Sequence, residues 1–197
     1  DWDPKDINLE TRRHYPPYWQ GFQIGAQFAF AKLLKNLAAD EIKIDLTLDK
    51  DRDATRICFA LSDHPGIFSR LSGALALVGA NVVDARSYTS KDGFATAAFW
   101  VQDSDGAPYD QSRFSRLRSM IEKTLSGEII TRDAIKKRDK FKKRERAFKV
   151  PTSITFNNEG SEIYTIIEVD TRDRPGLLFD LTRTLANLNV YIASAVI

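Results

Sequence analysis

The chain of 197 residues carries 29 Lys or Arg and 27 Asp or Glu, a formal net charge of +2 at pH 7. Its apolar and charged fractions, 43% and 28%, are ordinary for a soluble globular protein, and its length suits two modest domains. No apolar run reaches the roughly 18 residues that a membrane-spanning helix needs, so we expect no membrane span.

The start of the chain, Asp-Trp-Asp-Pro, lacks the charged and apolar segments of a secretory signal peptide, so we expect a cytoplasmic protein. The single cysteine, Cys58, lies in an apolar strand pattern without a disulfide partner. We expect it to be a buried structural thiol in a reducing compartment. Because the sequence does not begin with Met, we expect a segment of a larger protein.

Residues 1–40 are predicted to form a connector arm with one short helix. The segment at 14–19, His-Tyr-Pro-Pro-Tyr-Trp, contains two adjacent prolines that we expect to break regular structure. Beyond them a helical stripe of apolar residues indicates the short helix. These residues are Phe28, Leu33, Leu34 and Leu37.

Residues 41–128 are predicted to form an α+β unit in the order strand, strand, helix, strand, strand, helix. Alternation at 42–48, a charged turn and an apolar run at 57–61 indicate a hairpin. Apolar residues at helical spacing then extend over 67–78, and Gly79 ends that helix. The last elements are strands at 81–89 and 94–101, joined by an Asp-Gly turn, and a helix at 114–125.

The chain contains an internal repeat with an offset of 110 residues. Asp-His-Pro-Gly at 63–66 recurs as Asp-Arg-Pro-Gly at 173–176, and omission of Gly79 and Ala80 aligns Asn81-Val82 with Asn189-Val190. The second copy stops opposite Thr89, without counterparts of the 94–101 strand and the following helix. A sheet without a central strand has an unpaired edge, so we expect a longer natural chain or another molecule to complete it.

An Asp-x-Pro-Gly turn between a strand and a helix is suited to binding a zwitterion. Proline fits the first helical position, Asp63 or its neighbour can cap free N–H groups, and Gly66 allows positive φ or close backbone approach. Amides at the helix start can hold a carboxylate, while Asp63 or Asp173 can hold an amino group. The alternative is a helix start without ligand; recurrence of the turn favours binding.

The turn, its helix and the following Asn-Val resemble the ACT domain, a ferredoxin-like βαββαβ regulatory module that binds amino acids. Three stretches resemble the C-terminal tandem ACT region of bacterial PII uridylyltransferase/uridylyl-removing enzymes. They are IKKRDKFKKRERAFKVPTSITF at 135–156, EGSEIYTIIEV at 159–169 and DTRDRPGLLFDLTRTL at 170–185.

This resemblance implies an α+β fold with two ACT modules, each an antiparallel sheet with helices on one face, the second incomplete at its C-terminus. The implied domains are a connector arm at 1–40 that follows a hydrolase domain, a first ACT domain at 41–128, a basic helical linker at 129–150 and a truncated second ACT domain at 151–197. Ligand contacts are expected from each turn and from the start of the next strand. They are Asp63, His64, Gly66, Ile67, Phe68, Asn81, Val82, Asp173, Arg174, Gly176, Leu177, Leu178, Asn189 and Val190.

The resemblance implies a regulatory region that senses glutamine, with the PII protein as substrate of the larger enzyme, magnesium as that enzyme's cofactor, and pairing of ACT modules as a possible homodimer. We expect no catalytic or metal-binding residue and no cofactor in the segment itself. Gly160-Ser161 is followed by Asp170 and Asp173, one residue too widely spaced for a nucleotidyltransferase Asp-x-Asp. The two histidines, His14 and His64, are too few for a metal-dependent hydrolase site.

Three alternatives stay open. The modules can serve only for structure and dimerisation, or the pair can belong to another enzyme of amino-acid or alarmone metabolism. The third is nucleic-acid binding by the segment at 132–149, which holds ten Lys or Arg against three acidic residues. Its apolar residues recur every seven positions among charges of both signs, which favours a solvated helix and no nucleic-acid partner. Which module binds ligand, and which amino acid it binds, stay undecided.

Overall fold

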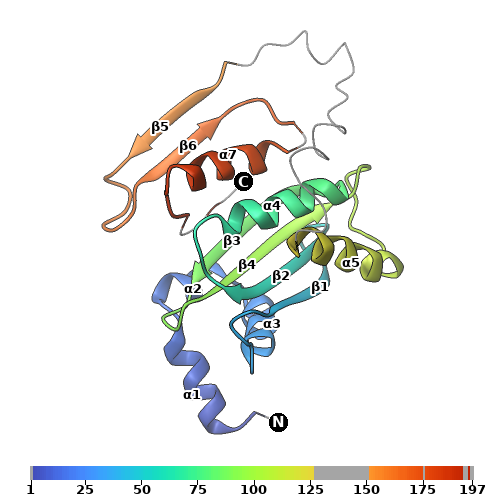
Figure 1. Cartoon of the computed structure of the whole chain (residues 1–197), viewed down its shortest axis with the longest axis vertical. Helices are drawn as coiled ribbons and strands as arrows, with labels where there is room; N and C mark the ends of the chain where they lie inside the picture. The colour runs from blue at the N-terminus through green and yellow to red at the C-terminus, as the bar shows by residue number, and fades with distance from the viewer. Residues whose placement is uncertain (1, 127–150, 175, 193–194, 196–197) are drawn as a thin grey trace.

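A computed structural model of the chain describes residues 2–126, 151–174, 176–192 and 195 (Figure 1). The helices are α1 (Pro4–Arg13), α2 (Pro16–Gly21), α3 (Ile24–Leu34), α4 (Ile67–Val78), α5 (Phe114–Leu125) and α7 (Leu177–Asn187), with a 3-10 turn at Gln111–Arg113. The strands are β1 (Ile42–Asp49), β2 (Ala54–Ser62), β3 (Asn81–Thr89), β4 (Phe94–Gln102), β5 (Ser153–Asn157) and β6 (Ile166–Asp170). The basic linker predicted at 129–150 lies outside the described residues.

The first repeat is an antiparallel four-stranded sheet in the order β1-β2-β4-β3, with α4 and α5 on one face (Figure 1). This confirms the predicted element order and sheet type. Alternate residues of the central strand β2 point to opposite faces, so Ile57, Phe59 and Leu61 pack beneath α4 and α5. We call this cluster, which also includes Phe99 and Leu71, the inner core.

The opposite face of the sheet is covered by the N-terminal arm. Tyr18 and Phe22 of the α2 region and a buried stripe of α3 pack on Cys58 of β2 and Trp100 of β4. We call this cluster the arm core; its other fully buried sheet residues are small, namely Ala54, Ala60 and Ala98. Small side chains let a helix lie close to the sheet. The arm is therefore a second helical layer, whereas the sequence predicted a connector with helices on one sheet face only.

The predicted pattern of the arm was wrong in two details. Pro16 and Pro17 do not break regular structure; they occupy the first turn of α2, where a missing N–H is tolerated. Phe28, placed in the apolar stripe, is 55% exposed, while the stripe that faces the sheet is Ala26, Ala29, Phe30 and Leu34. The wrong stripe followed from fitting large apolar residues and ignoring alanines.

The second repeat contributes β5, β6 and α7. β5 pairs with β6 antiparallel in a separate two-stranded sheet, and α7 packs beside α4 (Figure 1). The strand predicted from Asn189 does not begin there, because Val190 to Ile192 have no strand structure. Most of its remaining residues lie outside the described part of the chain. No helix among the described residues combines the length and apolarity required to cross a membrane.

Cys58 provides a test of the arm layer. Its side chain is 0% exposed, and burial raises the pKa of its thiol to about 12. Because the thiolate is the reactive form, we expect the native chain at pH 8 to resist a thiol reagent and to become labelled only when the arm or the whole fold opens. Labelling rates measured along a urea titration, with glutathione as the freely reactive control, check this. Rapid stoichiometric labelling without urea would contradict it.

Candidate functional site

The two Asp-x-Pro-Gly turns share one backbone geometry at the glycine. Gly66 has φ 85° and ψ 0°, and Gly176 has φ 78° and ψ 4°, a left-handed conformation that favours glycine. The amide of Ile67 donates to His64 O at 3.1 Å, and its counterpart Leu177 donates to Arg174 O at 3.0 Å. The repeat detected in the sequence is therefore a repeat of local structure.

The turn does not cap its helix as expected. Gly66 is the N-cap residue of α4, so Pro65 lies before the cap and not at the first helical position. No side chain caps this helix start. In the first turn of the helix, Ile67 donates to His64 O and Arg70 donates to Gly66 O. The amides of Phe68 and Ser69, which lie between them, have no hydrogen-bond partner among the described residues. Two donors at the positive end of a 12-residue helix are thus available to an anion.

The two repeats pack against each other through antiparallel helices. Ser72 of α4 and Thr182 of α7, which are equivalent positions 110 residues apart, place their hydroxyl oxygens at 3.2 Å. At one end of the contact, a Cβ on Gly66 would lie 3.5 Å from Cβ of Ala186. The N-terminus of α4 therefore meets the C-terminal end of α7, as in a pseudo-twofold pair.

A small cavity lies at this junction. Its volume is about 20 Å³, which is room for roughly one water molecule. It is lined by the first turn, the end of β3 and the end of the second repeat. The lining residues are Asp63, His64, Pro65, Gly66, Ile67, Phe68, Ser69, Ser87, Thr89, Thr182, Ala186, Val190, Tyr191 and Ile192.

Asp63 is the central polar group of the cavity. Its Oδ2 atom accepts a hydrogen bond from Thr89 Oγ1 of β3 and another, at 2.6 Å, from the phenol of Tyr191. Burial, and then the hydrogen bond to Asp63 and its charge, raise the pKa of Tyr191 to about 12. Both repeats therefore donate to one carboxylate oxygen.

The cavity brings together six of the fourteen residues that the sequence proposed as ligand contacts. They are Asp63, His64, Gly66, Ile67, Phe68 and Val190. The described residues of the second turn, at 173–174 and 176–178, are not part of it; there Arg174 donates to Asp180, and Leu178 packs against the inner core. Whether any of the fourteen binds a ligand stays a prediction.

Asn81 and Val82 lie away from the first turn. Asn81 pairs with Gln102 at one end of β3, whereas Thr89, which contacts Asp63, lies at the other end. The expectation that they face the first turn followed from chain order alone. Because α4 separates the turn from Asn81 by 12 residues, about 18 Å of helix lies between them.

The repeat alignment after the helix was also wrong. Asn189 has φ 56°, its amide donates to Ala186 O at 3.0 Å, and Val190 donates to Leu185 O at 2.9 Å. Gly79 and Ala80 make the equivalent bonds at 3.1 and 3.0 Å. Asn189 is therefore the counterpart of Gly79, not of Asn81, and the offset of 110 needs no gap here. Asparagine is the commonest non-glycine residue at this left-handed position.

Several cavity residues were missed by the sequence reasoning, notably Thr89, Thr182 and Tyr191. Thr89 reaches the first turn from the end of β3 in the same repeat, whereas Thr182 and Tyr191 are brought there by the antiparallel docking of α7 on α4. The described residues hold no cluster of three or more His, Cys, Asp or Glu placed for a metal ion.

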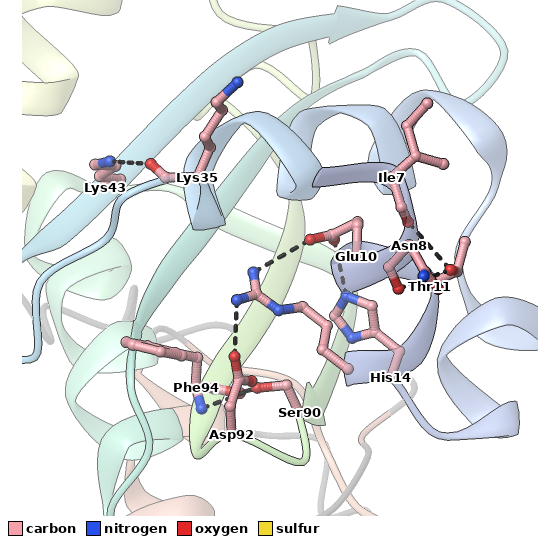
Figure 2. A network of polar contacts seen from close by, with 11 residues as sticks. Ile7, Asn8, Glu10, Thr11, His14, Lys35, Lys43, Ser90, Asp92 and Phe94 are labelled. Atoms are coloured by element: carbon pink, nitrogen blue, oxygen red, sulfur yellow. Dashed lines mark hydrogen bonds and ion pairs between the residues drawn. The ribbon is translucent and has the colours of Figure 1, made fainter. Parts of the chain in front are cut away.

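The hairpin between β3 and β4 connects the first turn to the arm. The amide of Asp63 donates to Gly93 O at 2.9 Å, and the amide of Lys91 donates to Arg13 O at 2.7 Å. Arg13 Nη2 also donates to Asp92 Oδ2 at 2.7 Å. Figure 2 shows Asp92 next to this network of α1, which continues through Glu10.

Glu10 and His14 complete the junction between the arm and the hairpin. Glu10 accepts from Arg13 at 3.1 Å, and its other oxygen lies 3.0 Å from His14 Nε2 (Figure 2). The His14 ring is buried and stacks on Tyr18 with centroids 3.5 Å apart. The end of α1 is thus fixed to the same hairpin that holds Asp63.

Comparison with known proteins agrees with this geometry. Residues 57–111 match the ACT domain family. The chain is 68% identical over 197 residues to a bifunctional uridylyltransferase/uridylyl-removing enzyme of Cereibacter sphaeroides, 65% identical over 201 residues to one of Ruegeria pomeroyi, and 40% identical over 200 residues to one of Azospirillum brasilense. These alignments cover 99% to 100% of the chain but 21% to 22% of each relative. Residues 57–111 therefore form an ACT domain, and the chain as a whole is similar to a segment that makes up about one fifth of these bifunctional uridylyltransferase/uridylyl-removing enzymes.

Proposed function

We propose that the chain is a glutamine-sensing regulatory region of a bifunctional PII uridylyltransferase/uridylyl-removing enzyme. The observation that carries the proposal is the pairing of two free helix amides, at Phe68 and Ser69, with the carboxylate of Asp63 in one cavity between the repeats. The amides suit the carboxylate of an α-amino acid, and Asp63 suits its ammonium group. The similarity to uridylyltransferase relatives supports glutamine as the amino acid.

The site lies where occupancy can affect the rest of a larger enzyme. Asp63 is bonded to the β3–β4 hairpin, and the hairpin is bonded to the end of α1. The proposed whole enzyme is cytoplasmic. It transfers UMP to PII in a magnesium-dependent reaction and removes UMP by hydrolysis. The arm at 1–40 would pass the signal to the catalytic domains, with a coupling of about 1–3 kcal/mol. The division of the chain into domains, with boundaries after residues 40, 128 and 150, is part of this proposal.

The test is calorimetric titration of the chain with glutamine. We expect Asp63→Asn to weaken glutamine binding by about tenfold or more, because a charge-assisted hydrogen bond to the ammonium group becomes a neutral one. Asp173→Asn, the same change at the equivalent turn, is the matched control and should leave the affinity unchanged, because Asp173 does not line the cavity.

A structural role without ligand sensing is the second candidate. The observation in its favour is the cavity volume of about 20 Å³, which is too small for an amino acid unless the junction opens. Absence of both binding heat and a shift in melting temperature with glutamine would favour this role. Binding that responds to Asp63→Asn but not to Asp173→Asn would reject it.

A further inference from the structure

The amine subsite of the proposed pocket is occupied by the protein itself. Asp63 Oδ2 accepts the phenol of Tyr191 at 2.6 Å, and Tyr191 lies 128 residues further along the chain. The second donor, Thr89, belongs to the same repeat as Asp63. Tyr191 is therefore the one of these two donors that crosses between the repeats.

A phenol hydroxyl presents the carboxylate with the same kind of contact as one N–H of an ammonium group. Both are donors to the same oxygen, and the space left beside Tyr191 admits about one water molecule. Because so little space is left, an α-amino acid whose ammonium group binds Asp63 Oδ2 takes the place of the Tyr191 hydroxyl. The Tyr191 side chain is free to turn away from Asp63, because it is 53% exposed.

We propose that Tyr191 is a built-in competitor for the ligand's ammonium group, so that ligand at Asp63 and the Tyr191–Asp63 hydrogen bond exclude each other. This rests on the proposed function of the cavity. Ligand binding then loosens the contact of residues 190–192 with the first repeat. Val190 and Ile192 line the same cavity, and Ile192 packs against the inner core, so this loosening changes the contact between the repeats.

Competition by Tyr191 has two consequences for the ligand. The apparent association constant is the intrinsic one multiplied by the fraction of molecules in which Tyr191 does not cover Asp63. A free ammonium group is also required, because an N-acetylated amino acid has no cationic donor with which to displace the phenol. The site therefore selects free α-amino acids over N-blocked ones.

The contact can be followed without ligand through the ionisation of Tyr191. A protonated phenol is needed to donate to Asp63, and the pKa of Tyr191 is raised from 10.0 to about 12. The stability that this contact contributes is present below pH 10.0 and is lost as the pH rises through about 12. The ¹³Cζ resonance of labelled tyrosine, assigned by its loss in Tyr191→Phe, reports this titration.

The experiment compares glutamine affinities by calorimetry for the unchanged chain, Tyr191→Phe and Tyr15→Phe. Tyr191→Phe should bind glutamine about tenfold more tightly, because the ring stays and only the competing hydroxyl is lost. Tyr15 is 52% exposed and lies on the arm, so Tyr15→Phe should bind as the unchanged chain does. Saturating glutamine should also bring the pKa of Tyr191 down from about 12 towards 10.0.

The outcomes separate the two proposals. If Asp63→Asn weakens glutamine binding but Tyr191→Phe does not strengthen it, the competitor role is overturned and the sensor function stands. If glutamine binds neither the unchanged chain nor Tyr191→Phe, both are overturned. Binding that appears only in Tyr191→Phe supports both. A Tyr191 resonance whose pKa is the same in Asp63→Asn as in the unchanged chain overturns the contact itself.

Discussion

Phe30→Ala is expected to lower the free energy of unfolding by about 3–5 kcal/mol. Phe30 is 0% exposed in the arm core. The centroid of its ring lies 4.8 Å from the ring centroid of Phe22 and 6.2 Å from that of Tyr18. Its loss leaves a cavity between α3 and the sheet, where Ala54, Ala60 and Ala98 are too small to fill it. The expected result is partial detachment of the arm at urea concentrations that leave the inner core folded.

Chemical denaturation measures the loss in the free energy of unfolding, and labelling of Cys58 reports whether the arm has detached from the sheet. Phe28→Ala is the matched control, because it removes the same side chain two residues earlier on the same helix. Phe28 is 55% exposed, so its loss should change stability by no more than about 0.5 kcal/mol. Equal effects of the two variants would mean that the arm does not pack on the sheet.

Ser72→Asp is expected to separate the two repeats. Ser72 is 2% exposed and its hydroxyl meets that of Thr182 between α4 and α7. An unpaired carboxylate buried there costs several kcal/mol, so the helices part and the carboxylate is hydrated. Only Phe179 and Thr182 of α7 are buried, and an isolated helix of 11 residues is marginal in water, so α7 should then lose its structure.

Amide hydrogen exchange distinguishes this result from general unfolding. In Ser72→Asp, amides of α7 should lose protection while those of β2 and β4 keep it. Ser72→Ala, which removes the hydroxyl without adding charge, should leave α7 protected. Unchanged protection of α7 in Ser72→Asp would show that the two helices do not form the described contact.

The sequence was sufficient for features set by neighbouring residues. The period of two in β1, the helical spacing of α4 and α5, and the glycine turns at 66 and 176 are local patterns, and the structure has each of them at or near the predicted bounds. The Asp63 turn, which lines the cavity, was also identified from a local pattern, because an Asp-x-Pro-Gly turn lies there between a strand and a helix.

The features that were missed depend on contacts between distant segments. Phe28 and Phe30 differ in burial because of where the arm meets the sheet, which helical spacing alone does not define. The strands of 54–62 and 94–102 are apolar on both faces, a pattern that indicates burial on two sides and that the sequence prediction did not use. Nothing local to Tyr191 indicates that it reaches Asp63.

The β3–β4 hairpin links the pocket to the N-terminal helices, because it is hydrogen-bonded to Asp63 on one side and to the end of α1 on the other. Asp92 lies on the arm side of this hairpin, where it accepts a hydrogen bond from Arg13, and it does not line the pocket. In the proposed sensor, replacements at Asp92 would therefore alter how occupancy is transmitted without removing a residue that lines the pocket.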